Sequence, residues 1–288
     1  MNQINLFIEL TRLKKPIGFM LLFWPCAWGL TLAYDFSTNL KNYFFYLILF
    51  FLGSVLMRSA GCIVNDILDK EFDAKVFRTK NRPIASGKVS IILGILYSIL
   101  LCFLALLVLL NFNSFTIILA LGSMPLAFTY PLMKRFTYWP QLFLGITFNY
   151  GLILGWTAVN GKLEIIPILF YIGAIFWTLG YDTIYGYQDI KDDEIIGLKS
   201  TSIKFKGKAK EFLFVCYAFV IIFFILGGFK MNFHFSYYIL ILIPLVHLFL
   251  YQIKKFDLNN PSSCLNAFKS NNLFGLIIFL NILIVKIL

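Results

Sequence analysis

Long apolar runs separated by short polar stretches make up most of the chain. Nine of these runs approach the length of about 20 residues that a helix needs to cross the hydrocarbon core of a bilayer. They cover residues 17–34, 43–66, 90–110, 114–131, 139–159, 164–185, 211–229, 237–253 and 270–287. Only the residues NFNS separate the third run from the fourth, which predicts a tight helical hairpin. The pattern predicts an all-α, polytopic membrane protein, a bundle of nine transmembrane helices in which residues 1–288 form a single domain.

Composition agrees with this class. Of the 288 residues, 60% are hydrophobic and 14% are charged, whereas soluble domains have about 45–50% apolar and about 25% charged residues. No cleavable leader is evident before the first run, so we expect the first span to act as its own insertion signal. The five cysteines are scattered through the chain, mostly in apolar runs, and we interpret them as small buried hydrophobic residues.

Lysines and arginines are distributed asymmetrically around the predicted spans. Of the 25, twenty fall in the N-terminal tail and in the loops after the even-numbered spans, and four fall on the opposite side. The remaining one, Arg58, lies inside the second span. The positive-inside rule therefore places the N-terminus and the long loops in the cytoplasm. The formal charge of +11 reflects this topology and attraction to anionic lipid, which disfavours a nucleic-acid partner.

Nine of the fourteen acidic residues fall in two short clusters. The first cluster, NDILDKEFD, ends the second span, and the second cluster, DTIYGYQDIKDDE, ends the sixth. These two spans run in the same direction, so both clusters reach the same face of the membrane. Residues spaced by four or seven share a helix face, which predicts one polar row for each cluster: Asn65, Asp69 and Asp73 in the first, and Asp182, Asp189 and Asp193 in the second.

Two rows of like charge require a cation, because carboxylates four residues apart destabilise a helix. The rows contain hard oxygen ligands and neither His nor Cys, which favours Mg²⁺, an ion that readily shares phosphate oxygens. The alternative is that the acids are solvated loop residues. That alternative suits a single cluster better than two clusters in phase on one face.

Basic residues accompany the acids, and a mixture of cations with Mg²⁺-binding carboxylates suits a polyphosphate. Positive-inside charge alone can explain any single lysine. Arg82 beside Pro83, and Tyr130 with Lys134 at helical spacing, favour a functional role. Arg58 lies about two turns inside the second span, where a charge is costly. We expect it either to anchor an anionic group at membrane depth or to form a structural salt bridge.

At these residues the sequence resembles the UbiA superfamily of intramembrane prenyltransferases. NDILDKEFD matches the signature N-D-x-x-D-x-x-x-D, and DTIYGYQDIKDD resembles D-x-x-Y-x-x-x-D-x-x-D-D. TYPLMKR is similar to Y-P-x-x-K-R. The flanking segments RLKKPIGFMLLFWPCAW, MRSAGCIVND and RTKNRPIASG resemble the branch that prenylates 4-hydroxybenzoate in ubiquinone synthesis.

The resemblance implies a helix bundle in two pseudo-repeated halves with cytoplasmic cap loops. It implies Mg²⁺-dependent transfer of a polyprenyl group from its diphosphate to the carbon ortho to the hydroxyl of 4-hydroxybenzoate, an early step of ubiquinone biosynthesis. The expected partners are these two substrates and the lipid bilayer, without an obligate protein partner. Because no transit-peptide pattern is evident and the loops are basic, we expect the bacterial inner membrane as the location.

The resemblance also implies roles for individual residues. The ligands around Mg²⁺ and diphosphate would be Asn65, Asp69, Asp73, Asp182, Asp189 and Asp193. Direct contacts to the diphosphate would come from Arg82, Tyr130, Lys134 and Arg135. The aromatic acceptor would lie beside Arg58 and Asn65. The candidate catalytic residues are Asp69, Asp182 and Asp189, and the base that takes the ring proton is either Asp182 or pyrophosphate.

Two other functions remain open from the residues. A UbiA-type prenyltransferase could act on another quinone precursor, on haem or on a lipid phosphate, because the aspartate motifs are common to all of these. A cation- or proton-coupled transporter would also use intramembrane acids. A transport path, however, needs polar groups near the midplane, whereas these acids gather at one face.

Overall fold

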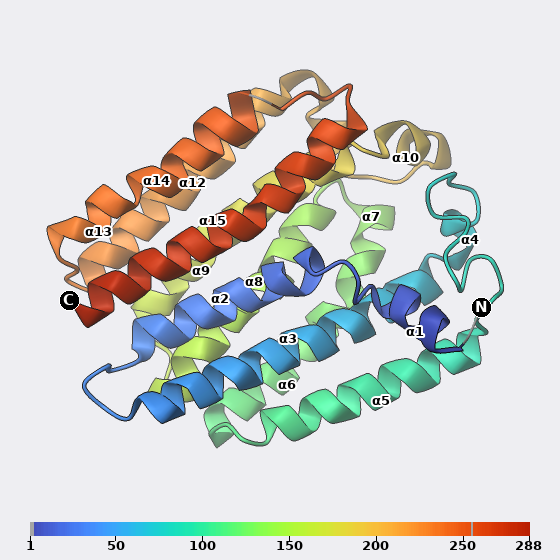
Figure 1. Cartoon of the computed structure of the whole chain (residues 1–288). Helices are drawn as coiled ribbons and strands as arrows, with labels where there is room; N and C mark the ends of the chain where they lie inside the picture. Colours follow the sequence, from blue (N-terminus) through green and yellow to red (C-terminus); the bar gives the residue numbers. More distant parts are fainter. Residues whose placement is uncertain (1–2, 255) are drawn as a thin grey trace.

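The computed structural model describes residues 3–254 and 256–288, and in these ranges the chain forms helices and loops without a strand (Figure 1). Eight helical segments are long and apolar enough to cross a membrane, and a shorter apolar helix, α2 (Ile17–Ala33), precedes them. This confirms the predicted all-α polytopic architecture. The eight segments are α3 (Leu40–Leu68), α5 (Ile91–Leu109), α6 to α7 (Ser114–Phe136), α8 (Pro140–Asn160), α9 (Ile165–Gly186), η2 to α12 (Lys206–Lys230), α13 to η3 (Phe235–Ile253) and α15 (Pro261–Ile287).

Shorter helices complete the chain. Two of the membrane segments consist of three helices each: α6 (Ser114–Thr129) continues through η1 (Tyr130–Leu132) into α7 (Met133–Phe136), and α13 (Phe235–Leu240) continues through α14 (Leu242–Val246) into the π-helical η3 (His247–Ile253). The other short helices are α1 (Gln3–Thr11), α4 (Lys70–Asp73), α10 (Ile190–Ile196), α11 (Thr201–Lys204) and η2 (Lys206–Lys208), which leads into α12 (Ala209–Lys230).

The last span is longer than the hydropathy predicts. Helix α15 begins at Pro261, whereas the apolar run begins at residue 270. The side chain of Asn260 accepts hydrogen bonds from the backbone amides of Ser262 and Ser263 and so starts the helix earlier. The first turns are rich in Ser and Asn, which lowers their hydropathy without preventing a helix. Lys269, which the topology prediction assigns to a loop, therefore lies within α15.

Helix α2 runs through the bundle in direct backbone contact with α8. A methyl group added at Gly29 would lie 1.9 Å from the carbonyl oxygen of Leu152, and one added at Gly155 would lie 2.4 Å from that of Cys26. The segment GLILG, from Gly151 to Gly155, has the small-xxx-small pattern that permits such an approach. Glycines therefore fix the separation of α2 and α8.

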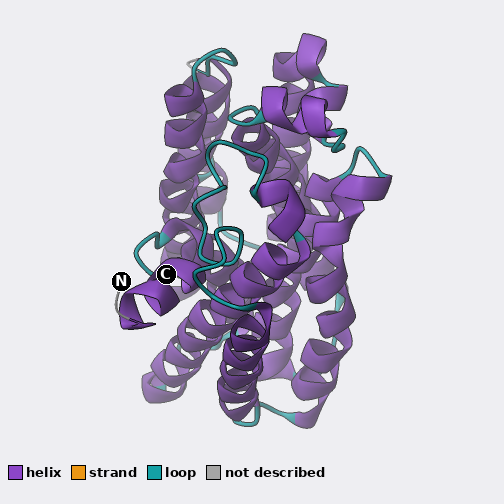
Figure 2. Ribbon diagram, turned by 90° about the vertical axis from the view of Figure 1, so that its right-hand side faces the viewer, coloured by secondary structure: helices purple, strands orange, loops and turns teal. Residues whose placement is uncertain are grey.

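The two termini lie at opposite ends of the bundle (Figure 1). Helices α1, α4 and α10 lie at one end, and the C-terminus of α15 lies at the other. Residues 74–90 contain no helix and form a long loop across the first end, which faces the viewer in Figure 2. The loop and the short helices around it form the cap predicted for this face.

The acidic clusters end two corresponding spans, because α3 leads into α4 and α9 leads into α10 at the same end of the bundle. Helix α3 ends before Asp69, yet the backbone amides of Asp69 and Asp73 still bond to the carbonyls four residues back, at 2.9 and 2.8 Å. The first row thus keeps its helical spacing. For the second cluster, the prediction that Asp182, Asp189 and Asp193 share one helix face is wrong. Helix α9 ends at Gly186 and α10 begins at Ile190, so a turn of the chain lies between Asp182 and Asp189.

Candidate active site

The buried carboxylate of Asp69 is the centre of the first cluster. Asp69 is 1% exposed, and the ammonium of Lys134 donates to its Oδ2. Nη2 of Arg135 lies 3.8 Å from Oδ1 of Asp69 and donates to the backbone carbonyl of Leu68 at 2.6 Å. The segment TYPLMKR therefore lies against the end of α3, in agreement with the topology prediction, which places both on the same face of the membrane.

Arg82 connects the cap loop to the other acids of the first cluster. Its Nη1 lies 2.7 Å from Oδ2 of Asp73 and 3.3 Å from Oδ1 of Asp66. The hydroxyl of Thr79 donates to the backbone carbonyl of Asp73 at 3.0 Å and holds the loop in place. Burial raises the pKa of Asp73 above its ordinary value, although the charge of Arg82 opposes this shift.

The second cluster is tied to the first by Arg78 of the same loop. Nε of Arg78 donates to Oδ1 of Asp189 at 2.8 Å, and Nη2 donates to Oδ2. Asp193 lies one turn further along, and the positive charge of Lys134 acts to lower its pKa. Burial, followed by the negative charge of Asp189, raises the pKa of Asp193 to about 6.

The donor set fits a divalent cation, although the described residues do not form a ready-made metal cluster. In the ranges 3–254 and 256–288, no three His, Cys, Asp or Glu side chains lie close enough to hold one ion. Oδ1 of Asp69 is nevertheless buried without a hydrogen-bond partner, and Asp193 is destabilised as a carboxylate by Asp189. Both conditions are relieved by a hard cation such as Mg²⁺. The convergence of both clusters on Mg²⁺ stays a prediction.

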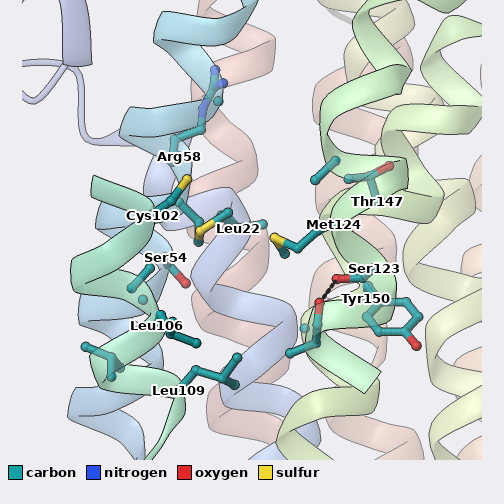
Figure 3. Close-up of a pocket in the computed structure, with 18 of the residues that line it drawn as sticks. Leu22, Ser54, Arg58, Cys102, Leu106, Leu109, Ser123, Met124, Thr147 and Tyr150 are labelled. Atoms are coloured by element: carbon teal, nitrogen blue, oxygen red, sulfur yellow. Dashed lines mark hydrogen bonds between the residues drawn. The ribbon is translucent and has the colours of Figure 1, made fainter. Parts of the chain in front are cut away.

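A cavity of about 750 Å³ runs between α2, α3, α5, α6 and α8 (Figure 3). Arg58 lies at one end of the view, and Leu109 lies at the other. Ile99 and Phe103 of α5 line the cavity while remaining 60% and 54% exposed, and Leu121 of α6 does so at 49%. The cavity therefore opens sideways between α5 and α6, where the bilayer would lie.

Arg58 is placed at the junction between the cavity and the acidic clusters. Its guanidinium lies 5.4 Å from the ring centre of Phe148, and its Nε is buried without a hydrogen-bond partner. Its charge acts on Tyr130, which also lines the cavity, and on Asp182 in the last turn of α9. No carboxylate in the described part of the chain forms a salt bridge with Arg58, so the structural alternative has no support there. Asn65 lies two turns further along α3 and is half-buried.

Comparison with known proteins identifies the family. Residues 22–282 match the model of the UbiA prenyltransferase family. The chain belongs to this family. It is 43% identical over 281 residues to the mitochondrial 4-hydroxybenzoate polyprenyltransferase of Arabidopsis thaliana, covering 96% of this chain and 68% of the relative. It is 44% identical to the protein of the same name from Bos taurus, covering 96% and 74%. It is 41% identical to 4-hydroxybenzoate geranyltransferase 2 of Lithospermum erythrorhizon, covering 98% and 91%.

Solved structures confirm the fold of this UbiA prenyltransferase. The apo UbiA homologue from Aeropyrum pernix K1 superimposes with a TM-score of 0.77 at 24% identity, over 93% of this chain and 98% of the other. The UbiA homologue from Archaeoglobus fulgidus bound to GPP and Mg²⁺ gives a TM-score of 0.70 at 18% identity, over 98% and 100%.

Two arginines of the site were not assigned a role from the sequence. Arg78 pairs with Asp189, and Arg12 pairs with Asp66. Their only signal in the sequence is membership of a basic segment on the same membrane face as the acids. Their neighbours in these segments, Lys14 and Lys75, give the same signal but form no ion pair within the described ranges. Only the three-dimensional structure shows which of these basic residues pair with the acids.

Proposed function

We propose that this UbiA prenyltransferase transfers a polyprenyl group from polyprenyl diphosphate to the ring carbon ortho to the hydroxyl of 4-hydroxybenzoate, as a step of ubiquinone biosynthesis. The observation that carries the proposal is the position of Arg58, a buried cation without a salt-bridge partner in the described ranges, where an apolar cavity meets a charged mouth. The names of the relatives from Arabidopsis thaliana and Bos taurus support the choice of acceptor.

The charged mouth would bind the diphosphate. Bound Mg²⁺, held by Asn65, Asp69, Asp73, Asp182, Asp189 and Asp193, would supply charge neutralisation to the leaving group. Lys134 and Arg82 now pair with Asp69 and Asp73 and lie where they could donate to phosphate oxygens instead. Arg135, 3.8 Å from Asp69, and Tyr130, which lines the cavity, could contact the diphosphate as well. Cations fixed before the reaction stabilise the charge that develops on the departing oxygen.

The cavity would hold the isoprenoid chain and keep the reacting carbon dry. Breaking the bond between the allylic carbon and the diphosphate oxygen leaves an allylic cation, which water would capture. Side chains such as Leu22, Leu106 and Met124 provide an apolar lining. The opening between α5 and α6 allows a long chain to continue into lipid.

Arg58 would bind the carboxylate of 4-hydroxybenzoate, with Asn65 nearby on the same helix. A guanidinium binds a carboxylate through two parallel hydrogen bonds, which fixes the orientation of the ring. The ring carbon ortho to the hydroxyl then forms the new C–C bond with the allylic cation. The proton lost from that carbon would pass to Asp182, whose carboxylate is within range of the charge of Arg58, or to pyrophosphate.

The proposal also includes the cellular membrane in which this multi-pass protein lies and its orientation there. We place the N-terminus and the charged mouth in the cytoplasm, at the bacterial inner membrane. The excess of basic residues that the sequence analysis assigns to the N-terminal tail and to the loops after the even-numbered spans supports the orientation. The relatives named above from Arabidopsis thaliana and Bos taurus are mitochondrial by name.

The decisive experiment measures prenylation in membranes that contain the full chain. We expect a prenylated product from 4-hydroxybenzoate, a polyprenyl diphosphate and Mg²⁺, and none when EDTA is added. 4-Hydroxybenzyl alcohol, which lacks the carboxylate, should react at least about tenfold more slowly if a charge-assisted contact to Arg58 is lost. Equal rates for the two acceptors would contradict the proposed acceptor class, and a lack of any product would contradict the reaction.

A further inference from the structure

Arg12 follows the N-terminal helix α1 and ends beside the first acidic cluster. Its backbone is left-handed, with φ of 56°, a conformation that residues other than glycine rarely adopt. Its Nη2 donates to Oδ1 of Asp66 at 2.6 Å. The ion pair and the packing around it, rather than local backbone preference, therefore hold Arg12 in place.

Helix α1 packs against the part of the cap loop that carries Arg82. Leu6 and Leu10 of α1 are buried in one hydrophobic cluster with Ile84 and Val89 of the loop and Ile63 of α3. Only Pro83 separates Ile84 from Arg82 in the chain. The N-terminal segment thus supports the loop by apolar packing, and its Arg12 pairs with Asp66, the same carboxylate that Arg82 of the loop contacts.

Asp66 is shared by two arginines. Its Oδ1 accepts from Arg12 at 2.6 Å and from Arg82 at 3.3 Å, and the residue is 2% exposed. Arg82 makes its shorter contact with Asp73, at 2.7 Å. Arg12 is therefore the main counter-charge of Asp66. Without Arg12, the buried carboxylate of Asp66 would have Arg82 as its remaining ion-pair partner in the described ranges. An uncompensated buried carboxylate would attract the guanidinium of Arg82 strongly.

We propose that Arg12 is a positioning residue for Arg82. By neutralising Asp66, it leaves the guanidinium of Arg82 available to the diphosphate of the prenyl donor. The inference rests on the proposed function, in which Arg82 contacts that diphosphate. This role also accounts for Asp66, an acid of the first cluster whose carboxylate pairs with two arginines. Asp66 orients these cations.

Binding of geranyl diphosphate in the presence of Mg²⁺ to the purified full chain tests this role without turnover. We expect Arg12→Gln to raise the Kd for geranyl diphosphate about tenfold, because Arg82 moves toward Asp66. The Kd for 4-hydroxybenzoate should stay within about twofold, since Arg58 is unchanged. Lys14→Gln removes an exposed charge two residues away and should leave both constants unchanged.

A double variant separates positioning from a general structural effect. In Arg12→Gln/Asp66→Asn the carboxylate no longer competes for Arg82, so the Kd should return to within about threefold of the wild-type value. A structural role would predict a double variant at least as impaired as Arg12→Gln. An unchanged Kd in Arg12→Gln, or a double variant that binds no better than the single one, would overturn the inference.

Arg12→Lys is measured as well, because Arg12→Gln leaves a buried carboxylate and can fail to fold. Lys keeps the charge but not the guanidinium geometry, so we expect a rise in Kd of about threefold. If only this variant folds, an unchanged Kd overturns the inference. If the wild-type chain binds geranyl diphosphate but does not prenylate 4-hydroxybenzoate, the proposed acceptor fails while the role of Arg12 is still decided by these constants.

Discussion

Arg78 of the cap loop and Asp189 at the start of α10 form a two-point ion pair, although they are 111 positions apart in the chain. Nε donates to Oδ1 at 2.8 Å, Nη2 donates to Oδ2, and Nη1 donates to the hydroxyl of Tyr185 at 3.2 Å. This arrangement uses the planar fork that only arginine provides. The pair ties the cap loop to the second acidic cluster, while Arg82 ties the same loop to the first.

The first prediction concerns Arg78→Lys, which keeps the charge and loses the second contact to Asp189. Because a lysine cannot bridge both carboxylate oxygens in parallel, we expect kcat/KM for polyprenyl diphosphate to fall about tenfold, with the KM for the acceptor unchanged. Initial rates with each substrate varied in turn provide the measurement. Lys75→Gln, an exposed change in the same loop, is the control. A wild-type kcat/KM for the donor in Arg78→Lys would show that the ion pair has no part in donor use.

The second prediction concerns the metal. Asp69→Asn keeps the size of the side chain but removes the charge from a buried carboxylate whose Oδ1 has no hydrogen-bond partner. We expect the prenylation rate to fall about 100-fold, and the Mg²⁺ concentration for half-maximal rate to rise. Glu71→Gln lies two residues away on an exposed position and should retain the rate within about twofold. If Asp69→Asn and wild type show the same Mg²⁺ dependence, Asp69 is not a ligand.

The membrane architecture could be predicted from the sequence because lipid leaves few choices. A spanning segment must satisfy its backbone hydrogen bonds internally, so an apolar run of sufficient length is read as a helix. The start of α15 was not predictable in this way, since a capped helix with polar early turns can begin before the apolar run. The turn between Asp182 and Asp189 was also missed, because periodic spacing does not reveal where one helix ends and another begins.

The candidate site could be predicted only in part for a similar reason. The spacing of Asn65, Asp69 and Asp73 reflects local backbone geometry, which the structure keeps. The partners of the acids come from distant segments: Arg78 from the cap loop, Arg12 from the segment after α1, and Lys134 from α7. No sequence period relates these segments to the acids. The pairs Arg78–Asp189 and Arg12–Asp66 therefore became visible only in three dimensions.

The third prediction concerns Arg58→Gln at the junction of mouth and cavity. Replacing the guanidinium removes a charge-assisted contact to the acceptor carboxylate, which corresponds to a rise of about 10- to 100-fold in the KM for 4-hydroxybenzoate. The KM for the donor should change little. The same variant should no longer distinguish 4-hydroxybenzoate from 4-hydroxybenzyl alcohol, as rates with the two acceptors would show. A variant that keeps the preference for the carboxylate would assign acceptor binding to another group.

The last prediction concerns the contact between α2 and α8, which form part of the cavity wall. In Gly29→Ala the new methyl group would lie 1.9 Å from the carbonyl oxygen of Leu152, so two helix backbones must move apart. Overpacking of this kind costs about 1–3 kcal/mol, and we expect a lower Tm for the purified protein in detergent. Gly122→Ala on α6 is the matched control, because a methyl there meets no atom within 4 Å and alanine favours a helix. A Tm for Gly29→Ala equal to that of Gly122→Ala would mean that α2 and α8 can separate without loss. The glycines would then not set the width of the cavity.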